Sequence, residues 1–185
     1  SWMSMVLYLA MAFWAAIGMI FNARLAFMLA QAIAPTGALM AFLSLWTGAL
    51  WGKPTWGTWW VWDARLTSEL ILLFLYIGYL SLRGAIDDER RADRASGLLA
   101  IVGAVNVPII YYSVKWWNTL HQGASVSVTQ GSSMAEIMLQ AMLIMSLALW
   151  AYCFAVVFAR VRTIILERER GAAWTRKHLP REQWA

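Results

Sequence analysis

The sequence predicts an all-α polytopic membrane protein, a bundle of five membrane-spanning helices with a Trp-rich loop on its extracytoplasmic side. Hydrophobic residues fill 61% of the 185 positions and charged residues only 14%, unlike the balance of a soluble domain. The charges cluster, leaving apolar runs close to the roughly 20 residues that a helix needs to cross about 30 Å of hydrocarbon. Because an isolated strand cannot satisfy its backbone groups in lipid, each run is expected to be a helix.

The predicted spans follow from these runs in chain order. The second and fourth contain Pro35 and Pro108, each of which removes one helical hydrogen bond and predicts a kink. The last contains Cys153, the only cysteine, so no intramolecular disulfide and no CxxC redox or zinc site can form. The five spans are expected at about 3–21, 27–50, 66–82, 97–112 and 137–159.

Lys and Arg divide unequally between the two sides of these spans. The side holding Lys53, Arg65 and Lys115 has three, so it is extracytoplasmic by the positive-inside rule, as are Ser1 and the loops 51–65 and 113–136. The basic residues therefore set topology and do not indicate nucleic-acid binding. An outside N-terminus predicts at least one further span before Ser1 in the intact protein. The cytoplasmic side holds twelve: Arg24, Arg83, Arg90, Arg91, Arg94, Arg160, Arg162, Arg168, Arg170, Arg176, Lys177 and Arg181.

The cytoplasmic segments are expected to carry no chemistry. Residues 83–94 are interpreted as a solvated helix-to-helix turn. The tail from Arg160 is expected to be a helix lying along an anionic lipid surface, with a partner contact as the alternative. The chain is accordingly divided into a membrane domain, 1–166, and a cytoplasmic basic tail, 167–185.

The densest motif is a run of five tryptophans within twelve positions on the extracytoplasmic side. One interpretation is an interfacial aromatic belt, since Trp favours the headgroup level. A belt spreads over many helix ends, however, whereas this cluster lies in one loop shaped by two glycines and a proline. A shelf of indoles at the membrane surface suits a flat apolar ligand such as a porphyrin. The residues are Trp51, Trp56, Trp59, Trp60 and Trp62.

His121 lies on the same side, in a segment that also carries Trp116 and Trp117. If this segment is helical, Trp117 and His121 share a face. An imidazole beside an aromatic shelf is a natural axial ligand for heme iron, although a lone interfacial His is more often a plain polar residue. His178, the other histidine, falls on the cytoplasmic side and is not expected to share this ligand.

Three ionisable residues flank the entry to the third span. Arg65 and Glu69 are spaced i, i+4 and could form a helical ion pair, while Asp63 is placed to cap the helix. In the functional interpretation, Arg65 meets a heme propionate and Asp63 fixes the indole loop through hydrogen bonds. Glu69 is expected to be mainly structural. No G-x-S-x-G, HExxH, Walker or C-x-x-C-H motif occurs, so no catalytic residue and no covalent heme attachment to this chain are expected.

The motif WGTWWVWD at 56–63 resembles the Trp-rich (WWD) signature of the heme-handling proteins of cytochrome c biogenesis. The longer stretches WGKPTWGTWWVWDARLTSELILLFLYIGY at 51–79 and NVPIIYYSVKWWNTLHQ at 106–122 are similar to the heme exporter protein C branch of that family, and the resemblance runs from Ser1 to about Leu166. It implies a six-helix protein of the bacterial inner membrane that binds heme b at the periplasmic surface through the Trp-rich loop and two flanking histidines. The second histidine matches His121, and the first would precede Trp2.

The resemblance also implies a role and partners. The protein would present heme for covalent loading onto a periplasmic heme chaperone, in complex with the ATPase and membrane subunits of an ABC exporter and a small single-span accessory protein. It would be a heme-binding subunit without catalytic activity of its own. Two alternatives remain open: a cytochrome c synthase (heme lyase) component, and a structural transporter subunit without its own ligand.

Overall fold

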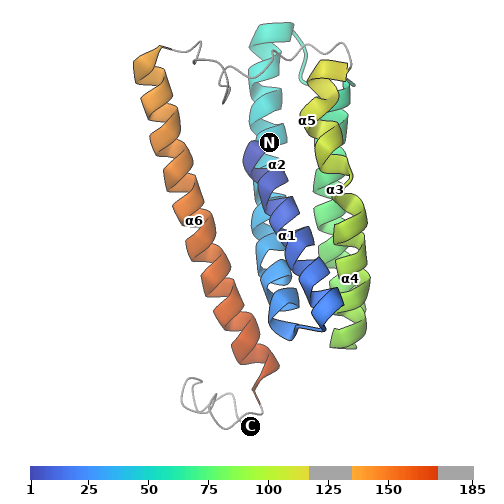
Figure 1. The fold of residues 1–185 in the computed structure, drawn as a ribbon. Coiled ribbons are helices and arrows are strands. Elements are labelled where there is room, and N and C mark those ends of the chain that lie inside the picture. Colours follow the sequence, from blue (N-terminus) through green and yellow to red (C-terminus); the bar gives the residue numbers. More distant parts are fainter. Residues whose placement is uncertain (117–134, 171–185) are drawn as a thin grey trace.

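The computed structural model describes residues 1–116 and 135–170, with the backbone alone at 114–116, and this part of the chain is helical (Figure 1). Five stretches are long and apolar enough to cross a membrane, with α4 and α5 forming one of them. The predicted fold class is confirmed, and each predicted apolar run lies inside one of these stretches. In chain order the helices are α1 (Trp2–Phe21), α2 (Arg24–Trp56), α3 (Ala64–Ala85), α4 (Glu89–Gly103), α5 (Asn106–Trp116) and α6 (Glu136–Arg168).

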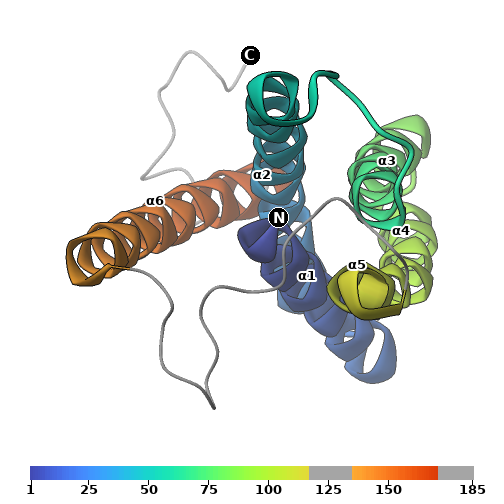
Figure 2. The same cartoon turned by 90° about the horizontal axis from the view of Figure 1, so that it is seen from above.

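The first four helices form a ring, in which α1 packs on α2, α2 on α3, α3 on α4 and α4 on α1 (Figure 2). α5 continues the span of α4 and packs mainly on α3. α6 lies outside the ring, packs mainly on α2, and diverges from the other helices toward its N-terminal end (Figure 1). The residues that it buries, Cys153, Val157 and Val161, all lie in its C-terminal half.

Two buried tyrosines fill the centre of the ring. The rings of Tyr8 and Tyr76 meet edge to face with centroids 4.9 Å apart, and the Tyr76 hydroxyl donates a 2.8 Å hydrogen bond to the Ser4 carbonyl. Glycines make room for both, because a Cβ at Gly37 would overlap the Tyr76 hydroxyl and one at Gly103 would overlap that of Tyr8. Small residues at helix contacts allow this close approach, as is common between membrane helices.

The fourth span is interrupted just before Pro108. Pro108 has no N–H to donate to the Ala104 carbonyl four residues earlier. That carbonyl instead accepts a 3.1 Å hydrogen bond from the Val107 N–H, and the α4 helix gives way to α5 over residues 104–105. The distortion predicted at Pro108 is thus confirmed. At the other predicted kink, α2 continues as one helix through Pro35.

The boundary predicted for the Trp-rich loop is wrong at its start. α2 does not end near residue 50 but continues to Trp56, so Trp51 and Trp56 are helical and only residues 57–63 form the turn. Pro54 is tolerated within the helix. The helix ends at Gly57, which adopts a left-handed conformation (φ 78°) and donates its N–H to the Lys53 carbonyl.

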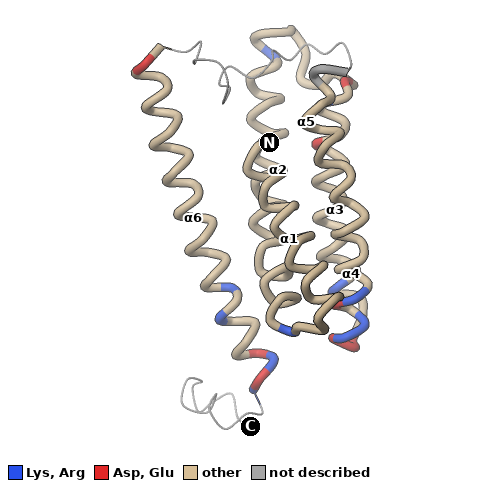
Figure 3. Tube along the Cα trace, viewed as in Figure 1, with Lys and Arg blue, Asp and Glu red and all other residues tan. Residues whose placement is uncertain are grey.

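The ends of the bundle differ in charge, as Figure 3 shows. The Trp-rich end is defined as the end that holds the C-terminus of α2, the turn 57–63 and the N-terminus of α3. The arginine-rich end is the opposite one, where α1 joins α2, α3 joins α4 and α6 ends. Within the described ranges it carries nine arginines against six carboxylates.

Most of the segment 83–94 is exposed, as expected of a solvated connection between helices, but it is not a turn throughout and it buries Asp93. Only residues 86–88 connect α3 and α4, and Asp93 is 5% exposed. Its carboxylate pairs with Arg83 and accepts two hydrogen bonds from Arg168 on α6, at 3.0 and 3.1 Å. The burial of Asp93 was not predicted, because one of its partners lies 75 positions away in the sequence and meets it only through tertiary packing.

Candidate functional site

The tryptophans at the Trp-rich end differ in how far their indoles are exposed. Trp51, Trp59 and Trp62 are exposed by 57, 55 and 76%, whereas Trp56 and Trp60 are half-buried. Large apolar side chains exposed together at a helix end mark a contact surface for lipid, protein or ligand. The five predicted tryptophans all lie at the Trp-rich end, three in the turn and two in the last residues of α2.

The indoles are arranged in edge-to-face pairs. Trp51 and Trp56 meet at 5.2 Å between centroids and 83° between planes, and Trp60 and Trp62 meet at 5.5 Å and 77°. The Lys53 ammonium lies 5.8 Å from the ring centroid of Trp59. In an edge-to-face contact the edge of one ring covers one face of the other, so the remaining exposed ring faces stay available to a further apolar partner.

Local hydrogen bonds hold the turn. The Thr58 hydroxyl donates to the Trp60 carbonyl at 3.0 Å, and the Lys53 ammonium donates to the Gly57 carbonyl at 3.1 Å. Asp63 is 9% exposed, and its carboxylate accepts a 2.7 Å hydrogen bond from the Leu66 N–H. The cap predicted for the third span is confirmed, and it fixes the exit of the turn onto α3.

Arg65 and Glu69 do not form the ion pair that their spacing allowed. The Arg65 guanidinium donates to the Ser1 hydroxyl at 3.3 Å, and one Glu69 carboxylate oxygen accepts from the Ser4 hydroxyl at 2.7 Å. The second oxygen of Glu69 has no hydrogen-bond partner within the described part of the chain, although the residue is only 2% exposed. Both side chains thus face groups on α1 or just before it.

These two residues line a cavity of about 330 Å³ at the Trp-rich end, and Trp51 lines it as well. The cavity joins the indole surface to a guanidinium and a buried carboxylate. The sequence analysis included Arg65 among the predicted site residues and expected Glu69 to be mainly structural. The signal that could have identified Glu69 is an acidic residue inside an otherwise uncharged span, where ionisable groups are costly.

The remaining site predictions fall at or beyond the edge of the described residues. Trp116 is the last residue of α5, which ends at the Trp-rich end (Figure 1), and only its backbone is described. Trp117, His121 and His178 lie outside the described residues. α6 begins at Glu136, also at the Trp-rich end, so the described chain on either side of 117–134 stops there (Figure 1).

The fold and site define a multi-pass helical membrane protein with an exposed cluster of indoles at one end. The chain belongs to the heme exporter protein C family, because the family model of that description matches residues 1–176. The family resemblance seen in the motifs at 51–79 and 106–122 is therefore confirmed.

Individual relatives agree with the family assignment. The heme exporter protein C of Escherichia coli (strain K12) is 57% identical over 122 residues, 66% of this chain and 50% of the relative. That of Haemophilus influenzae is 44% identical over 173 residues, covering 94% and 70%, and that of Bradyrhizobium diazoefficiens is 46% identical over 168 residues, covering 91% and 64%. The matched part of the chain spans half of the E. coli relative.

Proposed function

We propose that this protein binds heme b as a cargo at its Trp-rich end and presents it for covalent loading onto a periplasmic heme chaperone during cytochrome c maturation. Membership of the heme exporter protein C family supports the cargo. The excess of arginines at the opposite end supports an orientation in the bacterial inner membrane with the Trp-rich end facing the periplasm. The partners would be the ATPase and membrane subunits of an ABC exporter and a single-span accessory protein.

The groups at the Trp-rich end fit the chemistry of heme. A porphyrin is flat and apolar over most of its area, and the exposed faces of Trp59 and Trp62 offer a matching surface. Its propionates are carboxylates, and Arg65 lines the adjoining cavity with donors suited to a carboxylate. Asp63 would keep the indoles in place by capping α3.

The observation that supports the proposal is that the helix ends on either side of the segment containing His121 lie at the same end of the bundle as the indoles. α5 ends and α6 begins at the Trp-rich end. His121 lies outside the described residues but follows Trp116 by only five positions in the sequence, so the proposal assigns its imidazole to this end of the protein. A neutral imidazole there would ligate the iron, while Trp116 and Trp117 would add aromatic contacts and a vinyl edge would stay open to the chaperone.

The test is the visible spectrum of the intact protein purified with its chaperone, in the wild type and in two variants. His121→Ala, and Trp59→Leu with Trp60→Leu, are each expected to lower the Soret absorbance per protein by at least about tenfold and to reduce heme transfer. The control is Trp46→Leu, because Trp46 is exposed by 57% like Trp59 but lies within the α2 span, stacked on Phe42.

Heme content that survives both site variants would refute the assignment. A protein that is colourless even as wild type would favour the structural alternative, in which the indoles contact a partner domain. Equal loss in the Trp46→Leu control would mean that the indole variants act through folding, and it would remove the support that they give to a site at the turn.

A further inference from the structure

A second cavity, of about 520 Å³, lies at the arginine-rich end, between α2, α3, α4 and α6. Its volume is in the range of cavities that hold small molecules. Its polar lining consists of the donors Gln31, Arg83 and Arg160, the Thr163 hydroxyl and the Glu89 carboxylate. Three other lining residues, Pro35, Leu80 and Ile164, are apolar and come from the membrane-spanning parts of their helices. The lining is therefore amphipathic, with donors and an apolar wall in one space.

The groups around this cavity carry a surplus of positive charge. Arg83 and Arg168 share the carboxylate of Asp93, and the Arg168 Nε lies 3.6 Å from a carboxylate oxygen of Glu89. Arg160 lines the cavity and, within 1–116 and 135–170, pairs with no carboxylate. Three guanidinium groups thus face two carboxylates, which leaves one positive charge for a ligand to neutralise.

Hydrogen-bond donors are also left over. Because a guanidinium only donates, the contact of 3.2 Å between Arg168 and Gln31 fixes the Gln31 oxygen as the acceptor. The Gln31 amide N–H₂ group is then available on a residue that lines the cavity. Arg83 is held in place by Asp93 through one of its nitrogens and keeps further N–H donors.

We propose that this cavity binds the phosphodiester headgroup of an anionic phospholipid, with an acyl chain against Pro35, Leu80 and Ile164. A phosphodiester carries one negative charge, which matches the surplus around the cavity. Phosphate accepts hydrogen bonds from guanidinium groups in the way a carboxylate does, and basic pockets between membrane helices bind such headgroups. Free phosphate has the same headgroup chemistry but would leave the apolar wall without a partner.

The experiment measures binding to the intact protein in detergent micelles, by native mass spectrometry and by the shift in thermal unfolding midpoint. The probes are phosphatidylglycerol, phosphatidylcholine of the same acyl chains, and glycerol phosphate. Phosphatidylglycerol is expected to bind as a resolved adduct and to raise the midpoint. The other two are expected to bind at least about tenfold more weakly, since each lacks either the net charge or the acyl chain.

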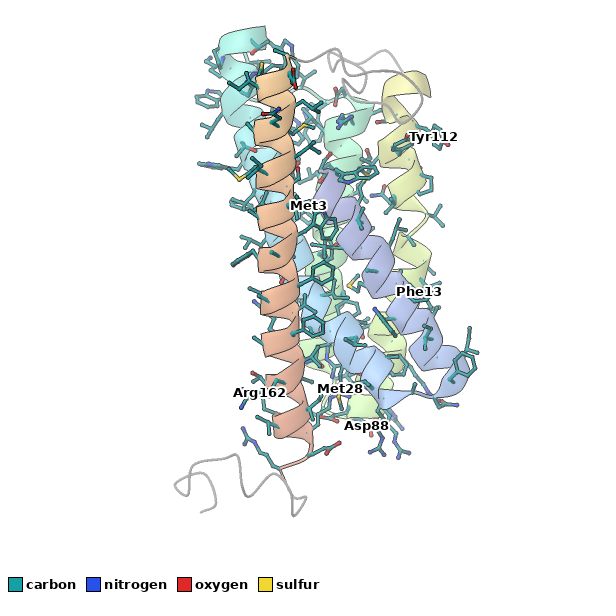
Figure 4. The ribbon with its side chains drawn as sticks, turned by 60° about the vertical axis from the view of Figure 1, so that its left-hand side comes forward. Met3, Phe13, Met28, Asp88, Tyr112 and Arg162 are labelled. Carbon is teal, nitrogen blue, oxygen red and sulfur yellow. The ribbon has the colours of Figure 1, made fainter. Side chains whose placement is uncertain are left out.

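Two variants test the location without removing the Asp93 pairs. Arg160→Gln removes the unpaired charge, and its matched control is Arg162→Gln, because Arg162 is exposed on the same helix and points away from the ring (Figure 4). Gly84→Leu fills the cavity without changing charge, since Gly84 lines it and an added Cβ there meets no atom within 4 Å. Both site variants are expected to weaken phosphatidylglycerol binding about tenfold, and the control less than about twofold.

Three results would overturn the proposal. Phosphatidylcholine binding as well as phosphatidylglycerol would mean that charge plays no part. Glycerol phosphate binding as tightly as the lipid would make the site one for a soluble phosphate. Arg160→Gln and Gly84→Leu behaving like Arg162→Gln would place any lipid effect on the general surface and not in this cavity.

Discussion

The two ends of the bundle differ in which side chains point inward and which point outward. At the arginine-rich end, Arg83 on α3 and Arg168 on α6 turn inward and share the carboxylate of Asp93 on α4. At the Trp-rich end, apolar indoles turn outward, and the Glu69 carboxylate and the Trp60 indole N–H each keep a buried polar atom without a partner among the described residues. The first arrangement stabilises the fold. The second leaves buried polar atoms unsatisfied among the described residues, which costs stability.

The largest effect is expected from breaking the inward-facing charges. Asp93→Asn would leave Arg83 and Arg168, whose side chains are 12 and 8% exposed, without their shared carboxylate. Losing one partner of a buried ion pair costs about 3–5 kcal/mol. The free energy of unfolding, measured by denaturant titration in micelles, should fall by that amount. Glu167→Gln, at an exposed position on α6, is the control, and an equal small change in both would contradict the buried network.

The two ends can be compared directly through a matched pair of helix caps. The Asp63 carboxylate caps α3 at the Trp-rich end and that of Asp88 caps α4 at the arginine-rich end, each accepting a backbone hydrogen bond of 2.7 Å. Replacing either by Ala should lower the free energy of unfolding by about 1 kcal/mol. Only Asp63→Ala should also reduce the heme absorbance, because only that cap holds the indole turn.

One result would contradict a special role for the Asp63 cap. If Asp63→Ala and Asp88→Ala change both stability and heme content alike, the cap has no separate role in the Trp-rich turn. Asp63→Asn preserves an acceptor at the cap and should behave nearly as the wild type in both measurements.

The smallest effect is expected at Lys53, the exposed charge of the Trp-rich end. Its ammonium contacts the Trp59 ring and the Gly57 carbonyl. Lys53→Met should cost only about 0.5 kcal/mol, since cation–π contacts at exposed sites are weak. Lys53→Arg keeps the contact and serves as the control. A loss approaching that of Asp93→Asn would mean that the two ends do not differ in how they use charge.

The sequence predicted the spans because the membrane imposes a length on every apolar run. It also predicted the Asp63 cap, which depends on neighbours only three residues apart. The end of α2 was predicted poorly, since this helix continues to Trp56 through residues that are no longer apolar, whereas the helix expected beyond Arg160 is present as far as Arg168. The length of a hydrophobic run reports the thickness of the lipid and not the length of the helix.

Contacts between distant segments could not be predicted in this way. The carboxylate of Asp93 stood among arginines in the sequence, where a solvated turn was the simplest interpretation, and its contact with Arg168 depends on how α6 returns to the ring. The pairing of Glu69 with Ser4 likewise joins residues 65 positions apart. Local spacing favoured Arg65 instead, because a helix places those two side chains on one face.

The one-sided attachment of α6 has a geometric consequence. A helix of 33 residues is about 50 Å long, so a tilt of about 5° around its anchored Arg168 end moves Glu136 by about 4 Å. The end of α5 is not displaced in this way, because α5 packs on α3 along the bundle. The distance between Trp116 and Glu136 at the Trp-rich end therefore depends on the tilt of α6, which is set by its contacts at the arginine-rich end.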